Sequence, residues 1–151
     1  MATSTAAARV LMTGRLDADD ALTLLEQVVS ESGTKHEVMN CVYFQGSDSD
    51  EAAATPVCIV GHVLDKLGKN LGDLSDLDCS GASVHRINTT DFSSLGVDAL
   101  DITDDARGLL YEAQMQQDGN RTNDRSWGAA LEAAHFHHKH RRGIAILAAA
   151  A

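Results

Sequence analysis

Apolar side chains recur every three or four residues in four stretches of this chain, which predicts four main helices. The first covers residues 17–32 and stops before a glycine, and the second covers residues 58–67. The third begins at Thr103 and the fourth after Ser126, and both are residue types that cap helices well. The expected core comprises Leu22, Leu25, Val29, Val60, Val63, Leu64, Leu67, Leu109, Leu110, Trp127 and Leu131.

A short β-hairpin is expected between the first two helices. Residues 38–44 are rich in β-branched and aromatic side chains, and a polar loop over 45–55 separates them from Pro56. The fold class is therefore a mainly α single small domain, with four or five helices and one hairpin in which 40–44 pairs near 56–58. We expect a flexible N-terminal arm over 1–15, a globular domain over 16–142 and an apolar C-terminal tail over 143–151, where Gly143 interrupts the last helix.

Charge narrows the classes of partner. The 151 residues carry a net charge of −10, which opposes binding to nucleic acid or anionic membranes and favours a basic protein partner. The longest apolar run, 144–151, is too short to span a bilayer. Three cysteines do not suggest a disulfide framework, and the first residues do not resemble a signal peptide, so we expect a cytoplasmic protein. No cofactor is expected, apart from zinc in one of the alternatives below.

Cys58, His62 and Asp65 form the first candidate site. On an ideal helix they share the side opposite the apolar stripe, and residues four apart can touch. Three alternatives follow: a metal site in which the hairpin adds Cys41, with zinc as the metal; a thiolate activated by the imidazole; or a packing cysteine beside a histidine bonded to the backbone. Zinc sites usually show tighter cysteine spacing than this chain has.

A histidine-rich stretch near the end of the chain forms the second candidate site. His135, His137, His138 and His140 lie among Lys139, Arg141 and Arg142. Such tracts bind nickel or zinc adventitiously. The stretch could also contact phosphate or the acidic surface of a second copy, or be a solvated basic helix end that the helix dipole favours. The apolar residues that follow suit a homo-oligomeric contact through the C-terminal segment.

The order of several motifs resembles a group of small uncharacterised proteins from actinobacteria and their bacteriophages. The motifs are Cys-x-Tyr, Pro-x-Cys-x-x-Gly-His-Val-Leu, Glu-Ala-Gln-x-x-Gln-Asp and Trp-Gly-x-Ala-Leu. They comprise Cys41, Tyr43, Pro56, Cys58, Gly61, His62, Val63, Leu64, Glu112, Ala113, Gln114, Gln117, Asp118, Trp127, Gly128, Ala130 and Leu131. The resemblance covers about residues 17–134 and implies no particular activity.

These features favour a non-enzymatic acidic accessory protein over an enzyme. It would act by protein–protein interaction in the host cytoplasm or in phage assembly, and a virion component is a variant of this class. The alternative is a small metal-binding protein or cysteine-dependent enzyme centred on Cys58 and His62. An enzyme requires an exposed Cys58 with a base within hydrogen-bond reach, whereas a binding protein does not.

Overall fold

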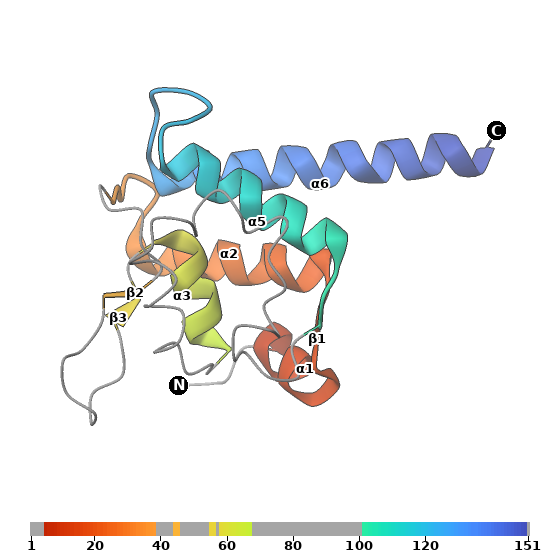
Figure 1. Cartoon of the computed structure of the whole chain (residues 1–151), viewed down its shortest axis with the longest axis horizontal. Helices are drawn as coiled ribbons and strands as arrows, with labels where there is room; N and C mark the ends of the chain where they lie inside the picture. Colours follow the sequence, from red (N-terminus) through yellow and green to blue (C-terminus); the bar gives the residue numbers. More distant parts are fainter. Residues whose placement is uncertain (1–4, 39–43, 46–54, 57, 68–100, 151) are drawn as a thin grey trace.

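Helices make up most of the described chain. The structure is a computed structural model, and it describes residues 5–38, 44–45, 55–56, 58–67 and 101–150. Its described helices are α1 (Thr5–Thr13), α2 (Ala18–Ser32), α3 (Ile59–Lys66), α5 (Asp104–Gln117) and α6 (Trp127–Ala150) (Figure 1). The mainly helical, small single-domain fold predicted from the sequence is thereby confirmed.

The two long helices α5 and α6 form an antiparallel pair joined by the connection 118–126 (Figure 1). Helix α2 packs against both of them, and α3 contacts α2 and α5. Helix α1 packs on α2. Helix α6 runs past the N-terminal end of α5 and projects from the rest of the described chain (Figure 1).

A parallel pair of two-residue strands sets the starting points of α2 and α5. Strand β1 (Arg15–Leu16) pairs with β4 (Asp101–Ile102), with Leu16 opposite Ile102. The backbone N–H of Asp101 donates to the Gly14 carbonyl at 2.8 Å, and that of Thr103 donates to the Leu16 carbonyl at 3.0 Å. Because a helix follows each strand directly, this pairing places the first turns of α2 and α5 side by side.

The predicted hairpin is present. Strand β2 (Phe44–Gln45) pairs antiparallel with β3 (Thr55–Pro56), so that Phe44 lies opposite Pro56 and Gln45 opposite Thr55. Strand β3 lies just before α3 in the sequence and contacts it, so the hairpin adjoins the N-terminal end of that helix.

The core lies between α2, α3, α5 and α6. Val63 is fully buried, which confirms the helical phase predicted for α3. All other predicted core residues are also buried, except Leu22 and Leu131, which are partly buried and pack against the core. The buried set also includes Leu16 and Ile102 from the paired strands, which no local apolar pattern indicated.

The flexible arm predicted for residues 1–15 is wrong over the part that the structure describes. Residues 5–13 form α1, and Ala6, Ala7 and Val10 are buried against the core. The three positions fall on one helical face, although two of them are alanines and give a weak apolar signal. The strand β1 follows directly, so residues 15 and 16 belong to the sheet.

The predicted boundary at Gly143 is also wrong. Helix α6 continues without interruption to Ala150, so residues 143–150 are helical and do not form a separate tail. A glycine within a helix costs only about 1 kcal/mol relative to alanine. The surrounding isoleucine, leucine and alanine residues favour the helix enough to carry it through that position.

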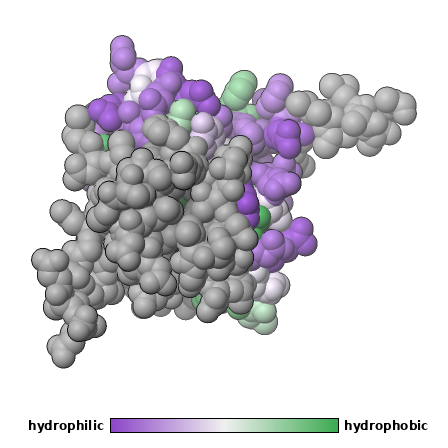
Figure 2. All heavy atoms as spheres, viewed as in Figure 1, coloured by the Kyte–Doolittle hydropathy of each residue, from purple (hydrophilic) through white to green (hydrophobic). Residues whose placement is uncertain are grey.

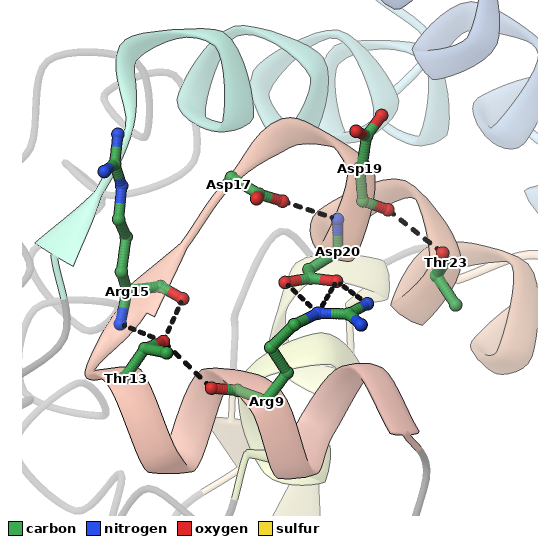
Figure 3. A network of polar contacts seen from close by, with 7 residues as sticks. All are labelled: Arg9, Thr13, Arg15, Asp17, Asp19, Asp20 and Thr23. Atoms are coloured by element: carbon green, nitrogen blue, oxygen red, sulfur yellow. Dashed lines mark hydrogen bonds and ion pairs between the residues drawn. The ribbon is translucent and has the colours of Figure 1, made fainter.

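An ion pair fastens α1 to the first turn of α2 (Figure 3). The Arg9 Nε–H donates to both carboxylate oxygens of Asp20, at 3.0 and 3.1 Å, and Nη2 also donates to Oδ1. Asp20 is only 3% exposed, and its backbone N–H donates to the cap residue Asp17 at 2.8 Å. The hydrogen bond to Asp20 raises the pKa of Arg9 above its usual value.

We predict that Arg9→Ala lowers the thermal unfolding midpoint more than Arg15→Ala does. The first change leaves a buried Asp20 carboxylate without its cationic partner, and such uncompensated charges destabilise proteins strongly. Arg15 is exposed on β1, so its truncation is the matched control. Equal shifts for the two variants, measured by circular dichroism at neutral pH, would show that the ion pair does not hold α1.

Candidate functional site

Cys58 caps the N-terminus of α3 and does not lie within the helix. Its backbone is extended, and its Sγ accepts a hydrogen bond from the Gly61 N–H at 3.3 Å. The residue is completely buried. His62 places Nδ1 at 2.9 Å from the Cys58 carbonyl oxygen, so this ring nitrogen donates to the main chain and not to the sulfur. The imidazole is therefore not arranged as a base for the thiol.

The predicted polar face of Cys58, His62 and Asp65 is not formed. Cys58 is buried, His62 is half-buried and Asp65 is exposed, because the extended conformation of Cys58 removes it from the helical register. Cys41, the further ligand of the predicted zinc site, lies outside the described residues. Within the described part of the chain, no three His, Cys, Asp or Glu side chains are grouped so that they could hold a metal ion.

Buried glutamines connect the end of α5 to the start of α3. Gln117 is completely buried, and its Oε1 accepts a hydrogen bond from the Ile59 N–H at 2.7 Å. Its Nε2 donates to Asp118 Oδ1 at 3.1 Å, and Gln114 Nε2 donates to the same oxygen at 3.2 Å. Sequence reasoning missed this role, for which the Glu-Ala-Gln-x-x-Gln-Asp motif was the available signal. The motif satisfies a helix N-terminus and has no reactive geometry.

Trp127, the first residue of α6, contacts α3 and the segment that follows α2. The rings of His36 and His62 approach it edge-on, with centroids 4.5 and 5.0 Å from the indole. The Trp127 backbone N–H donates to the His36 carbonyl at 2.9 Å, and the Gly128 N–H donates to the Thr34 carbonyl at 2.8 Å. The histidine of the first candidate site thus packs against the core tryptophan, which is a structural role.

The histidine-rich stretch lies on α6 and contacts two neighbouring helices. His135 Nε2 lies 3.1 Å from Glu26 Oε1, and His138 Nε2 lies 3.1 Å from Asp19 Oδ1, so both reach α2. On the other side, Arg141 Nε lies 3.4 Å from Asp105 Oδ1 of α5. Through Asp19 and Asp105, the contacts of His138 and Arg141 tie the middle of α6 to the first turns of α2 and α5. The stretch does not gather its histidines at one point.

The outer face of the α5–α6 pair carries two adjoining hollows of about 330 and 340 Å³. They share Glu112 and His137, and the first is bordered by Gly108, where a Cβ atom would lie 2.5 Å from His137 Nε2. The second hollow, called here the α6 groove, is lined by Glu112, Gln116, Arg121, Ala133, Phe136, His137 and His140. Because Gly108 has no side chain, the His137 ring can lie between α5 and α6.

An exposed aromatic side chain borders the α6 groove. Phe136 is 72% exposed, and the His140 ring lies parallel to it, within 4° and with centroids 6.1 Å apart. Among the described residues, the other large apolar side chains that are exposed are Leu11 and Met12 of α1. The coloured surface near α5 and the first half of α6 is mostly hydrophilic (Figure 2). Phe136 is thus an exposed apolar side chain on α6 that sequence analysis did not single out.

Comparison with known proteins identifies no relative. No family model, no curated protein and no solved structure matches this chain. The resemblance to actinobacterial and phage proteins therefore stays a prediction. Among the described helices, none combines the length and apolar character that crossing a bilayer would require.

We predict that thiol reagents modify Cys58 only as fast as the protein unfolds. The sulfur is buried and accepts the Gly61 N–H, so a reagent has no access to it in the folded state. Peptide-resolved mass spectrometry after timed alkylation at neutral pH will separate Cys58 from the other two cysteines. Rapid alkylation of Cys58 in the native protein would instead support the alternative in which Cys58 is an activated thiolate.

We predict that His137 makes the folded protein less stable as pH falls below about 6.5. Burial, with a smaller effect of Arg141 and His140, lowers the pKa of His137 from its ordinary value of 6.5, whereas Glu112 and Asp105 raise it. The neutral form is therefore favoured by folding, and this stabilisation is present above pH 6.5 and lost as pH falls toward the lower folded-state pKa.

Denaturant unfolding at pH 7.5 and 5.5 measures this effect. His137→Gln should lose less stability than the wild-type protein between these pH values, by a modest amount because the ring is partly exposed. Lys139→Gln, also exposed on α6 and not among the groups that act on His137, is the control. An unchanged pH dependence in His137→Gln would contradict the assignment.

Proposed function

We propose that this protein is a non-enzymatic acidic accessory protein that acts by binding another protein through α6. The proposal depends on one observation: α6 extends beyond the helices against which it packs in this chain. Its 24 residues span about 36 Å, whereas the 14 residues of α5 span about 21 Å. A helical end of this length is marginal in water without packing, so a partner would stabilise it.

The exposed Phe136 supports the same proposal. It lies on α6 and lines a groove of about 340 Å³ together with Ala133, His137 and His140. Aromatic side chains of this kind often supply much of the binding energy of an interface when a partner covers them. The net charge of −10 favours a partner whose surface is basic.

The geometry at Cys58 favours a binding protein over the cysteine-dependent or metal-binding alternative. A nucleophilic thiol needs access to a substrate and a base at its sulfur, whereas Cys58 is buried and His62 Nδ1 bonds its carbonyl oxygen. The setting in the cytoplasm of an actinobacterial host, or in phage assembly there, is part of the proposal and depends on the motif resemblance alone.

Site-specific photo-crosslinking in actinobacterial cells tests the proposal. Benzoylphenylalanine in place of Phe136 should give a discrete covalent adduct, whose identity mass spectrometry establishes. The same group in place of Met12, which is 87% exposed on α1, is the control and should give none.

The purified components then decide between specific and incidental capture. Phe136→Asp should weaken binding of the captured protein by at least about tenfold, as expected for a central aromatic contact, whereas Met12→Asp should leave it unchanged. Circular dichroism verifies that both variants are folded. Absence of an adduct at Phe136, or equal effects of the two substitutions, would contradict the proposal.

A further inference from the structure

The His137 ring occupies the place where a side chain at position 108 would begin. A Cβ atom on Gly108 would lie 2.5 Å from Nε2 of His137 and 3.0 Å from Cε1, so this edge of the ring faces the backbone of α5. No hydrogen bond or ion pair joins the ring to another residue that the structure describes. Packing over the glycine therefore holds the ring, and no polar partner does.

This position suits a neutral imidazole better than a protonated one. A neutral ring carries a single N–H and can turn its unprotonated nitrogen toward Gly108, whereas a protonated ring carries an N–H at both nitrogens. The Nε2–H of the protonated ring would face α5 without an acceptor, and a buried donor without an acceptor costs free energy. Burial accordingly lowers the pKa of His137.

Charged and titratable groups from three elements surround the ring. They are Asp104, Asp105, Tyr111 and Glu112 of α5, Arg121 of the connection 118–126, and His140 and Arg141 of α6. Glu112 and, to a smaller extent, Asp105 raise the pKa of His137, whereas Arg141 and His140 lower it. Glu112 is thus the group that most favours the protonated ring.

Glu112 also has the position and the capacity to accept a hydrogen bond from His137. The two side chains line both hollows on the outer face of the α5–α6 pair, so they border the same space. Arg121 donates to both carboxylate oxygens of Glu112 at 3.0 Å, but each oxygen has a second lone pair that can accept another donor. Asp105, in contrast, is paired with Arg141.

We propose that His137 is a two-position switch: the neutral ring lies over Gly108, and the protonated ring turns away into the hollow and donates to Glu112. The first hollow, of about 330 Å³, borders both residues and provides the space for this movement. Because His137 also lines the α6 groove, the movement changes the shape of that groove beside Phe136. It occurs in the free chain and does not depend on the proposed function.

Nuclear magnetic resonance of the full chain tests the movement directly. The Cε1–H signal of His137, assigned among the seven histidines by its absence from His137→Gln, reports protonation between pH 8 and 5.5. At pH 8 this proton should show a nuclear Overhauser effect to the Hα atoms of Gly108, because Cε1 faces that residue. The effect should weaken along the same pH curve as the chemical shift. A constant effect while the ring titrates would overturn the proposal.

Gly108→Ala should hold the ring in its outer position at every pH. The new Cβ atom occupies the place of Nε2, and alanine favours a helix interior over glycine by about 1 kcal/mol, so we expect the variant to fold. Its His137 ring loses the buried position and stays beside Glu112, so the pKa of His137 should rise above that of the wild-type protein. If the ring instead keeps its place, the added methyl group buries it further, and an unchanged or lower pKa would contradict the switch.

Glu112→Gln and Asp104→Asn test whether Glu112 is the acceptor. Both exchange a carboxylate of the first hollow for an amide of the same shape, but Asp104 is not among the groups that act on His137. The first change should lower the pKa of His137, and the second should leave it nearly unchanged. Equal effects of the two variants would show that the protonated ring does not turn toward Glu112.

These results are independent of those that test the proposed function. Each uses the isolated chain, and none requires a bound partner. A partner captured at Phe136 while the ring stays over Gly108 at low pH would support the proposed function and overturn the switch. A ring that moves in a chain that captures no partner would do the reverse.

Discussion

The backbone pairing of β1 with β4 determines where the main helices begin, and the position of α6 depends on it. Backbone hydrogen bonds join these strands and the residues beside them, and the first turns of α2 and α5 follow them directly. Asp19 and Asp105 therefore lie close enough to meet the same helix, through His138 and Arg141. Exposed ion pairs of this kind add little stability individually, but together they specify the level at which α6 leaves the body.

Local patterns in the sequence predicted the helices well and their partners poorly. The phase of α3 follows from its apolar spacing, and Val63 is buried as that spacing requires. Nothing local indicates that Leu16 pairs beside Ile102, because the contact joins segments far apart in the chain. Helix α1 was missed because its buried face is largely alanine, and alanine is also common in disordered arms.

The candidate site could be located from the sequence, but its chemistry could not. A Cys58-x-x-x-His62 spacing suggests facing side chains only if both residues are helical. The backbone of Cys58 is extended, and this one dihedral difference converts the sulfur from a potential ligand into a helix cap. Gln117 was likewise readable only as a polar residue in an amphipathic helix, since its acceptor role depends on the position of Ile59.

Gly108 has a consequence for how relatives of this chain could be recognised. Its missing side chain leaves the space that the His137 ring fills, and a Cβ atom there would lie 2.5 Å from that ring. A larger residue at position 108 therefore requires the His137 ring to move aside or position 137 to become smaller. Paired substitution at these two positions would identify chains that share the α5–α6 crossing even where overall sequence similarity has been lost.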